Sequence, residues 1–70
     1  MELTRKQLML VEAIRWFWEE YNIGPTYREL AEMLNTTPGT MFERVLKLEK
    51  MGVVKTNVGK SRSIRVVEDV

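Results

Sequence analysis

The sequence contains no cysteine and no histidine among its 70 residues. Without them the chain can form no disulfide or zinc-thiolate site, and it has no thiol nucleophile or imidazole base. The only two serines, Ser61 and Ser63, therefore lack an imidazole to activate them. We expect no catalytic residues, no metal site, no cofactor and no small-molecule substrate. The composition favours a binding module over an enzyme.

Long apolar runs are also absent. No stretch approaches the ~20 apolar residues of a membrane-spanning helix, and residues 1–4 lack the basic segment that begins a signal peptide. We expect a cytoplasmic chain with no membrane partner. Its 44% hydrophobic and 30% charged residues are typical of a globular protein, and the length suits one domain over residues 1–70.

The net charge is only +1, but its distribution is uneven. Residues 1–37 carry a formal charge of −2, residues 38–65 carry +5, and the last five residues carry −2. A basic segment on a nearly neutral chain is typical of a protein that presents one face to an anionic polymer. Ordinary solvated charge is the alternative, and the charge pattern alone does not decide between them.

The first helix is predicted from its cap and its apolar period. Thr4 and Gln7 have the spacing of a capping box. Residues 22–25 stop the helix that follows, because Gly24 frees the backbone and Pro25 disfavours a helical conformation in the residue before it. Its expected buried stripe, at helical spacing, consists of Leu10, Ile14, Phe17 and Tyr21.

Two further helices are predicted. Thr26 and Glu29 form a second capping box, which begins a helix from residue 27 to about residue 34. Thr37 caps a third helix with Pro38 in its first position, and Gly52 ends it. The expected buried residues are Leu30, Ala31 and Leu34 in the second helix and Met41, Val45 and Leu48 in the third.

Beyond residue 52 the apolar period changes from 3.6 to 2. Residues 53–56 and 63–67 are predicted to be strands, joined by a turn at residues 57–60. Three helices followed by a β-hairpin give an α+β, mainly α fold. This order is that of a winged helix-turn-helix, in which the hairpin is the wing.

A helix-turn-helix lays its second helix, here residues 37–51, into the major groove of DNA. Turning the apolar stripe inward leaves a polar face opposite, and Gly39 there lets the backbone approach the DNA. Thr40 and Glu43 suit base edges, and Arg44, between the two faces, can reach a base or a phosphate. Lys47 and Lys50 are expected to contact phosphates.

Two other clusters are expected to bind phosphates. The N-terminus of the second helix contributes free backbone N–H groups, and the hairpin tip is expected to bury nothing. Together with the polar third helix, these clusters favour double-stranded DNA as the partner, although a three-helix domain needs no DNA to fold. The first cluster is Thr26, Tyr27 and Arg28, and the second is Lys60, Ser61 and Arg62.

Four segments resemble the DNA-binding domain of the LexA-type SOS repressors, in the same order and at matching spacings. They are residues 3–7 (LTRKQ), 24–31 (GPTYRELA), 51–54 (MGVV) and 61–65 (SRSIR). The resemblance implies sequence-specific binding to a promoter operator, usually as a dimer on a palindrome, and transcriptional repression. It also implies backbone contacts by the wing and base contacts by Thr37, Gly39, Thr40, Phe42 and Glu43.

The sequence also departs from that family. Phe42 replaces an acidic or small residue, Gly39 replaces an asparagine-like one, and the turn between the second and third helices is a residue shorter. The operator sequence therefore cannot be carried over. The family's self-cleaving serine–lysine protease domain, which also holds its dimer together, is not found in this sequence.

Several apolar residues fall outside the predicted core. Met9 and Trp16, with Ala13 beside them, project from the first helix opposite its buried stripe. They indicate either a homodimer or partner-protein face or ordinary surface packing. Phe42, with Leu46 one turn on, either contacts a thymine methyl group or packs on the flank of the third helix. A protein-interaction winged helix using these side chains is the alternative function.

Overall fold

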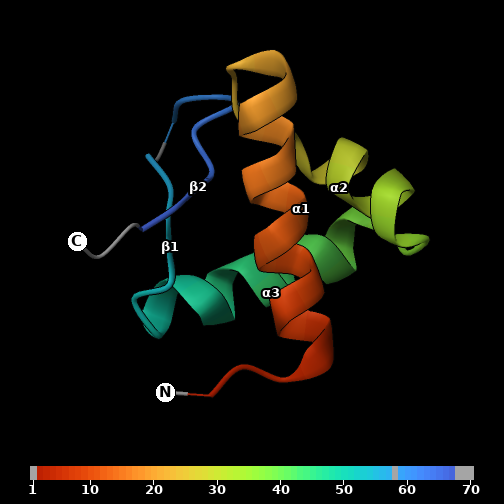
Figure 1. The fold of residues 1–70 in the computed structure, drawn as a ribbon, viewed down its shortest axis with the longest axis vertical. Helices are drawn as coiled ribbons and strands as arrows, with labels where there is room; N and C mark the ends of the chain where they lie inside the picture. The colour runs from red at the N-terminus through yellow and green to blue at the C-terminus, as the bar shows by residue number, and fades with distance from the viewer. Residues whose placement is uncertain (1, 58, 68–70) are drawn as a thin grey trace.

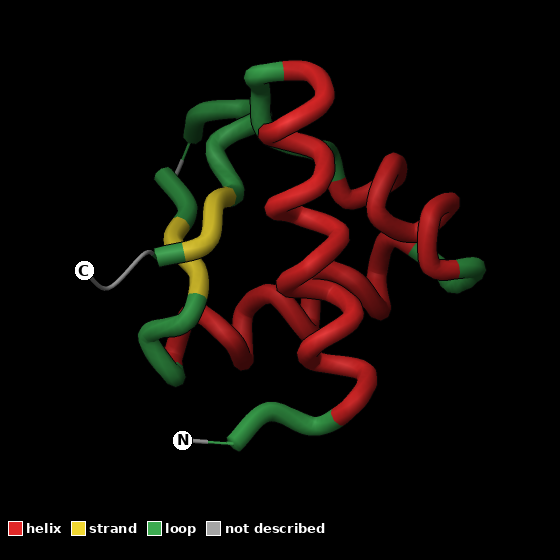
Figure 2. The backbone as a smooth tube through the Cα atoms, viewed as in Figure 1, coloured by secondary structure: helices red, strands yellow, loops and turns green. Residues whose placement is uncertain are grey.

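The computed structural model describes residues 2–57 and 59–67 (Figure 1). Three helices come first: α1 (Arg5–Tyr21), α2 (Tyr27–Leu34) and α3 (Pro38–Lys50). Two short antiparallel strands follow, β1 (Val54–Lys55) and β2 (Arg65–Val66). The predicted winged helix-turn-helix order is confirmed. α2 packs against both α1 and α3, and the wing lies beside α1 and the C-terminal end of α3 (Figure 2).

The predicted caps set the helix starts. Thr4 Oγ1 accepts from the Gln7 N–H at 3.1 Å, while Gln7 Oε1 accepts from the Thr4 N–H at 2.9 Å. Thr26 and Glu29 form the same reciprocal pair at 3.1 and 2.8 Å. Thr37 caps α3, because its Oγ1 accepts from the Thr40 N–H at 3.2 Å. Side chains thus satisfy amides that have no partner within their own helix.

The helix ends rest on left-handed residues. α1 and α2 terminate at Asn22 and Asn35, with φ of 59° and 57°, a conformation that asparagine tolerates better than most residues. The first cap, Asn22, lies at the start of residues 22–25, so the predicted stop of α1 is confirmed. After α3, Gly52 adopts a φ of 80°, as predicted.

One hydrophobic core joins all three helices to the wing. All of the stripe predicted for α3 is buried, and α1 and α2 contribute most of theirs. The wing adds Val54 and Ile64. The core cluster consists of Leu10, Val11, Ala13, Ile14, Leu30, Ala31, Met41, Val45, Leu48, Val54 and Ile64.

Three burial expectations were wrong. Tyr21 is 57% exposed, because it is the last residue of α1 and its ring rests on Phe17 with centroids 4.7 Å apart. Leu34, at the end of α2, is only partly buried. Ala13 belongs to the core with 7% exposure, although we expected it beside an exposed face of α1.

The wing has a shorter ladder than predicted. Its register pairs Val54 with Val66 and Lys55 with Arg65, so each strand has two residues. Towards the tip, Ser63 replaces ladder bonds, since its hydroxyl accepts from the residue 57 N–H at 3.0 Å. This polar turn explains why the strand pattern at residues 53–56 and 63–67 overestimated the ladder.

The wing is tied to the turn between α1 and α2. The Trp18 indole N–H donates to the Ile64 carbonyl at 2.7 Å. A Cβ added to Gly24 would lie 2.4 Å from the Arg62 carbonyl oxygen, so the wing backbone passes where a side chain would otherwise be. Figure 1 shows the segment before β2 running beside the C-terminal part of α1.

Two further features are absent from residues 2–57 and 59–67. No helix there has both the length and the apolar character to cross a membrane. No cluster of three or more acidic side chains in those ranges could hold a metal ion.

We predict that Gly24→Ala lowers the free energy of unfolding by about 1–3 kcal/mol, because the added methyl group must displace wing backbone. Gly39→Ala is the matched control. An added Cβ there meets nothing within 4 Å, and alanine favours a helix by up to about 1 kcal/mol. Urea unfolding followed by circular dichroism measures both. A Gly24→Ala variant as stable as the parent would contradict the close approach.

Candidate nucleic-acid interface

The outer face of α3 is exposed and polar. Because its apolar stripe is buried, four residues on the opposite side of the helix are exposed to solvent. Thr40, at the edge of this face, is partly exposed. The spacing of a helix therefore gives the face that the sequence predicted. The exposed residues are Gly39, Glu43, Lys47 and Lys50.

The cap of α3 affects what its threonines offer to a ligand. The Thr37 hydroxyl accepts from the Thr40 N–H and donates its proton to Thr40 Oγ1 at 2.9 Å. Thr37 has thereby used its only hydroxyl proton. Thr40 accepts in that pair and keeps its own proton to donate outward. Of the two, Thr40 is the better donor to a base edge.

Arg44 lies on the flank of α3 that is turned away from the wing. It is partly exposed and lines a surface hollow with Lys6 and Met9 of α1 and with Thr36 of the turn before α3. The structure thus brings Lys6 beside Arg44. The sequence analysis did not single out Lys6, because no periodic signal relates the start of α1 to α3.

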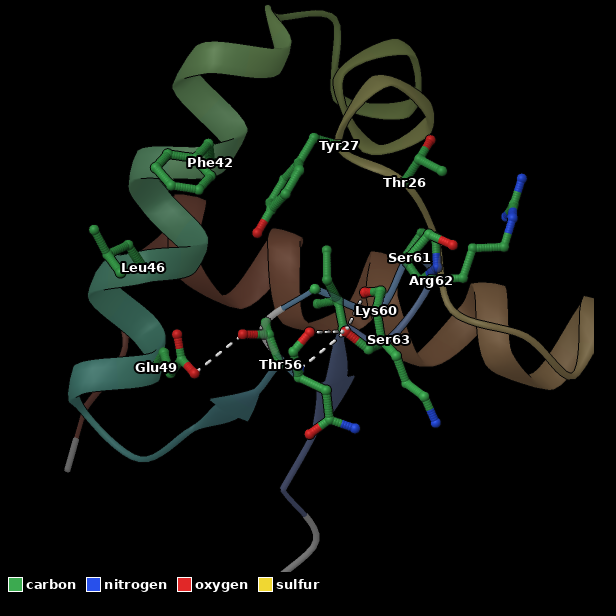
Figure 3. Close-up of a pocket in the computed structure, with 14 residues that line it drawn as sticks. Thr26, Tyr27, Phe42, Leu46, Glu49, Thr56, Lys60, Ser61, Arg62 and Ser63 are labelled. Atoms are coloured by element: carbon green, nitrogen blue, oxygen red, sulfur yellow. Dashed lines mark hydrogen bonds between the residues drawn. The ribbon is translucent and has the colours of Figure 1, made fainter.

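On the opposite flank, α3, the start of α2 and the wing enclose a groove of about 500 Å³ (Figure 3). We call it the wing groove. Phe42 rests on Tyr27 with ring centroids 5.4 Å apart and planes at 72°. Phe42 is still 50% exposed, and Leu46 lies beside it along the groove. The contact with Tyr27 agrees with packing on the flank of α3, and the exposed half of the ring leaves Phe42 available for the alternative contact with a thymine methyl group.

The wing groove also has a polar wall. Thr56 of the wing donates its hydroxyl proton to Glu49 Oε2 at 3.1 Å, which joins the wing to α3. Burial raises the pKa of the Tyr27 phenol, and the negative charge of Glu49 raises it further. Tyr27 therefore stays protonated at neutral pH, and its hydroxyl can donate to an anion.

The capping box uses two of the backbone amides at the N-terminus of α2. The Thr26 N–H already donates to Glu29 Oε1, and the Glu29 N–H donates to Thr26 Oγ1. The predicted capping box is confirmed, and these two backbone amides are not available to a ligand. Arg28, whose side chain is exposed, remains beside them as a cation.

Arg62 differs most from expectation. Its Nη1 donates to Glu29 Oε1 at 2.9 Å and to the Gly24 carbonyl at 3.1 Å, and its Nη2 donates to Glu29 Oε2 at 3.1 Å. The guanidinium also lies 6.0 Å from the centre of the Phe17 ring. The described residues of the hairpin tip are exposed, as expected, but Arg62 also ties the tip to Glu29 of α2 and to Gly24 in the turn after α1. Lys60 and Arg62 leave the wing in different directions (Figure 3).

Met9, Ala13 and Trp16 of α1 differ in their exposure and surroundings. Met9 and Trp16 are exposed by 47% and 45%, but Ala13 between them is buried. Trp16 packs edge-on against Tyr21, with centroids 5.9 Å apart, and lines a different hollow from Met9. A homodimer or partner contact through Met9, Ala13 and Trp16 would therefore need a surface that Ala13 does not provide.

Comparison with known proteins points to one family. The family model of the LexA DNA binding domain matches residues 1–63. The LexA repressor of Thermosipho africanus is 34% identical over 67 residues, which cover 96% of this chain and 34% of that protein. The LexA repressor of a Marinomonas species is 35% identical over 69 residues, with 97% and 33% covered. The chain thus spans about a third of the length of these relatives.

A further match is shorter and closer. An uncharacterized HTH-type transcriptional regulator of Pyrococcus abyssi is 57% identical over 30 residues, which cover 43% of this chain and 20% of that protein. It is similar to this chain over less than half of the domain.

The Arg62–Glu29 pair predicts a specific response to acid. The Arg62 hydrogen bond, followed by the Thr26 amide, lowers the pKa of Glu29. A carboxyl group with a lowered folded-state pKa stabilises the fold above its unfolded pKa of about 4.3 and loses that contribution as pH falls through the folded value. We expect the urea midpoint of Glu29→Gln to fall less between pH 5 and 3 than that of the parent.

Glu32→Gln is the control, because it removes an exposed carboxylate from the same helix. Its urea midpoint should follow the parent as pH falls. Identical pH profiles for Glu29→Gln and the parent would show that the ion pair contributes nothing to stability.

Proposed function

The chain belongs to the LexA DNA-binding domain family, and on this premise we propose that it binds double-stranded DNA and represses transcription at the promoter it recognises. The observation that supports the proposal is the exposed polar face of α3. This face lies next to the wing groove, and the wing forms the opposite wall of that groove. The LexA repressors it matches are about three times as long. No catalytic role is part of the proposal.

We place α3 in the major groove. Thr40 donates its remaining hydroxyl proton to a base edge, Glu43 accepts from a cytosine amino group, and Gly39 allows the helix to lie close. The half-exposed ring of Phe42, steadied by Tyr27, presents an apolar edge that suits a thymine methyl group. Thr37, at the start of α3, and Arg44, on its side, are the other two proposed base contacts.

Cations on both sides of α3 hold the DNA backbone. Lys47 and Lys50 lie on the exposed face towards the C-terminal end of the helix, and Lys60 with Ser61 lies at the exposed wing tip. The N-terminus of α2 adds the Arg28 side chain, the Tyr27 hydroxyl and the backbone N–H groups near Thr26 that the capping box does not use. These contacts supply affinity for any sequence, whereas base contacts supply preference. A regulator of this kind acts where the chromosome is, which agrees with the expected cytoplasmic location.

We expect the affinity for DNA to depend strongly on the salt concentration. Several phosphate contacts release bound counterions, so affinity for random duplex DNA should fall roughly tenfold or more over a fourfold rise in salt. Fluorescence anisotropy with a labelled duplex measures this. No binding, or binding indifferent to salt, would contradict the proposal. A stable oligomer without DNA affinity in size-exclusion chromatography would favour the protein-interaction alternative.

The second prediction separates base readers from phosphate contacts. Thr40→Ala and Glu43→Gln should relax preference at individual base pairs by about 1–3 kcal/mol in a selection from a random duplex pool. Lys47→Ala and Lys60→Ala should weaken all sequences alike. The same selection shows whether the preferred site is a palindrome. If the lysine variants changed preference and the helix variants did not, the assignment of roles would be wrong.

A further inference from the structure

We propose that Arg62 is a positioning residue: with Glu29 it clamps the wing to the start of α2, so that Lys60 and Ser61 meet the same DNA as α3. The sequence alone suggested a phosphate contact for Arg62, which is a different role. The inference rests on the proposed function, because it concerns how that DNA-binding surface is assembled.

The guanidinium is occupied by the protein itself. Its two terminal nitrogens meet the two Glu29 oxygens in the bidentate arrangement that arginine forms best, and one of them also binds the Gly24 carbonyl. The side chains of Arg62 and Glu29 are 38% and 32% exposed. A phosphate approaching Arg62 would also approach the Glu29 carboxylate, which repels it. Geometry and charge therefore both disfavour a direct contact.

The backbone of the wing is shaped to make this contact. Arg62 has a φ of 56°, a left-handed conformation that is costly for a residue other than glycine. Its carbonyl occupies the space that a Gly24 side chain would need, and the Trp18 indole holds the Ile64 carbonyl two residues further on. α1, the turn after it and α2 thus all hold the same short segment.

The wing needs such support because its own ladder is short. Two paired residues per strand give little independent stability, and even longer isolated hairpins are marginal in water. Lys60 and Ser61 directly precede Arg62, so their position depends on where Arg62 is held. Glu29 is fixed in turn by its capping bond to Thr26, at the start of the helix that packs on α3.

Glu29→Gln tests the inference because the two roles predict opposite signs. Glutamine keeps the capping box but loses the carboxylate charge. If Arg62 contacted phosphate, the change would release a cation and remove an anion, and DNA binding would tighten. If Arg62 positions the wing, binding should weaken roughly three- to tenfold although the protein becomes more positive. Tighter binding by Glu29→Gln would overturn the proposal.

Glu32→Gln provides the matched control, since it makes the same charge change on α2 and leaves the clamp in place. It should bind DNA as tightly as the parent, or slightly more tightly. Lys60→Ala adds a second test. It should weaken the parent several-fold but change Glu29→Gln less than twofold, because an unclamped wing no longer holds Lys60 at the DNA. Equal losses in both backgrounds would overturn the proposal.

Amide hydrogen exchange tests the clamp without DNA. In Glu29→Gln the amides of Asn57 and Lys60, which are hydrogen-bonded within the wing, should exchange faster, while those of α3 stay as protected as in the parent. Equal acceleration throughout would indicate a general loss of stability and contradict a positioning role. If the parent failed to bind DNA, the proposed function would fall, and the exchange data would still decide whether the pair holds the wing.

Discussion

The burial of Met41, Val45 and Leu48 is the constraint on which the rest of the structure depends. These side chains are at most 1% exposed, and they fix the rotation of α3 about its own axis. Once that rotation is fixed, every other side chain of the helix is directed by the 100° spacing of successive residues. The polar face is turned outward, Phe42 and Leu46 face the wing groove, and Arg44 faces α1.

The wing has no comparable constraint of its own. Among the described residues of the wing, Val54 and Ile64 alone are buried completely enough to join the core. A domain of this size has little apolar surface to spare for a hairpin, so directional contacts must hold it. The Arg62–Glu29 pair, the Trp18 indole and the Thr56–Glu49 bond do this from three different helices.

This difference explains which parts of the fold and of the candidate site could be predicted from the sequence. Local signals gave all three helices, their threonine caps and the buried face of α3, because capping and apolar spacing act within a few residues. The family resemblance was likewise carried by short local segments. The role of Arg62 was not predictable, since its partner lies 33 positions away and nothing in either segment records the pairing. The same applies to Ala13, whose burial depends on how other elements pack against α1.

The clamp also changes how the charge of the chain should be counted. Residues 38–65 carry a formal +5, but Arg62 is neutralised by Glu29 from the acidic N-terminal part. The positive electrostatic potential at the wing tip must then come from Lys60 rather than from Arg62. Using one cation to position the wing suits so small a domain, because a wing that is already held in place loses less conformational freedom when Lys60 meets the DNA.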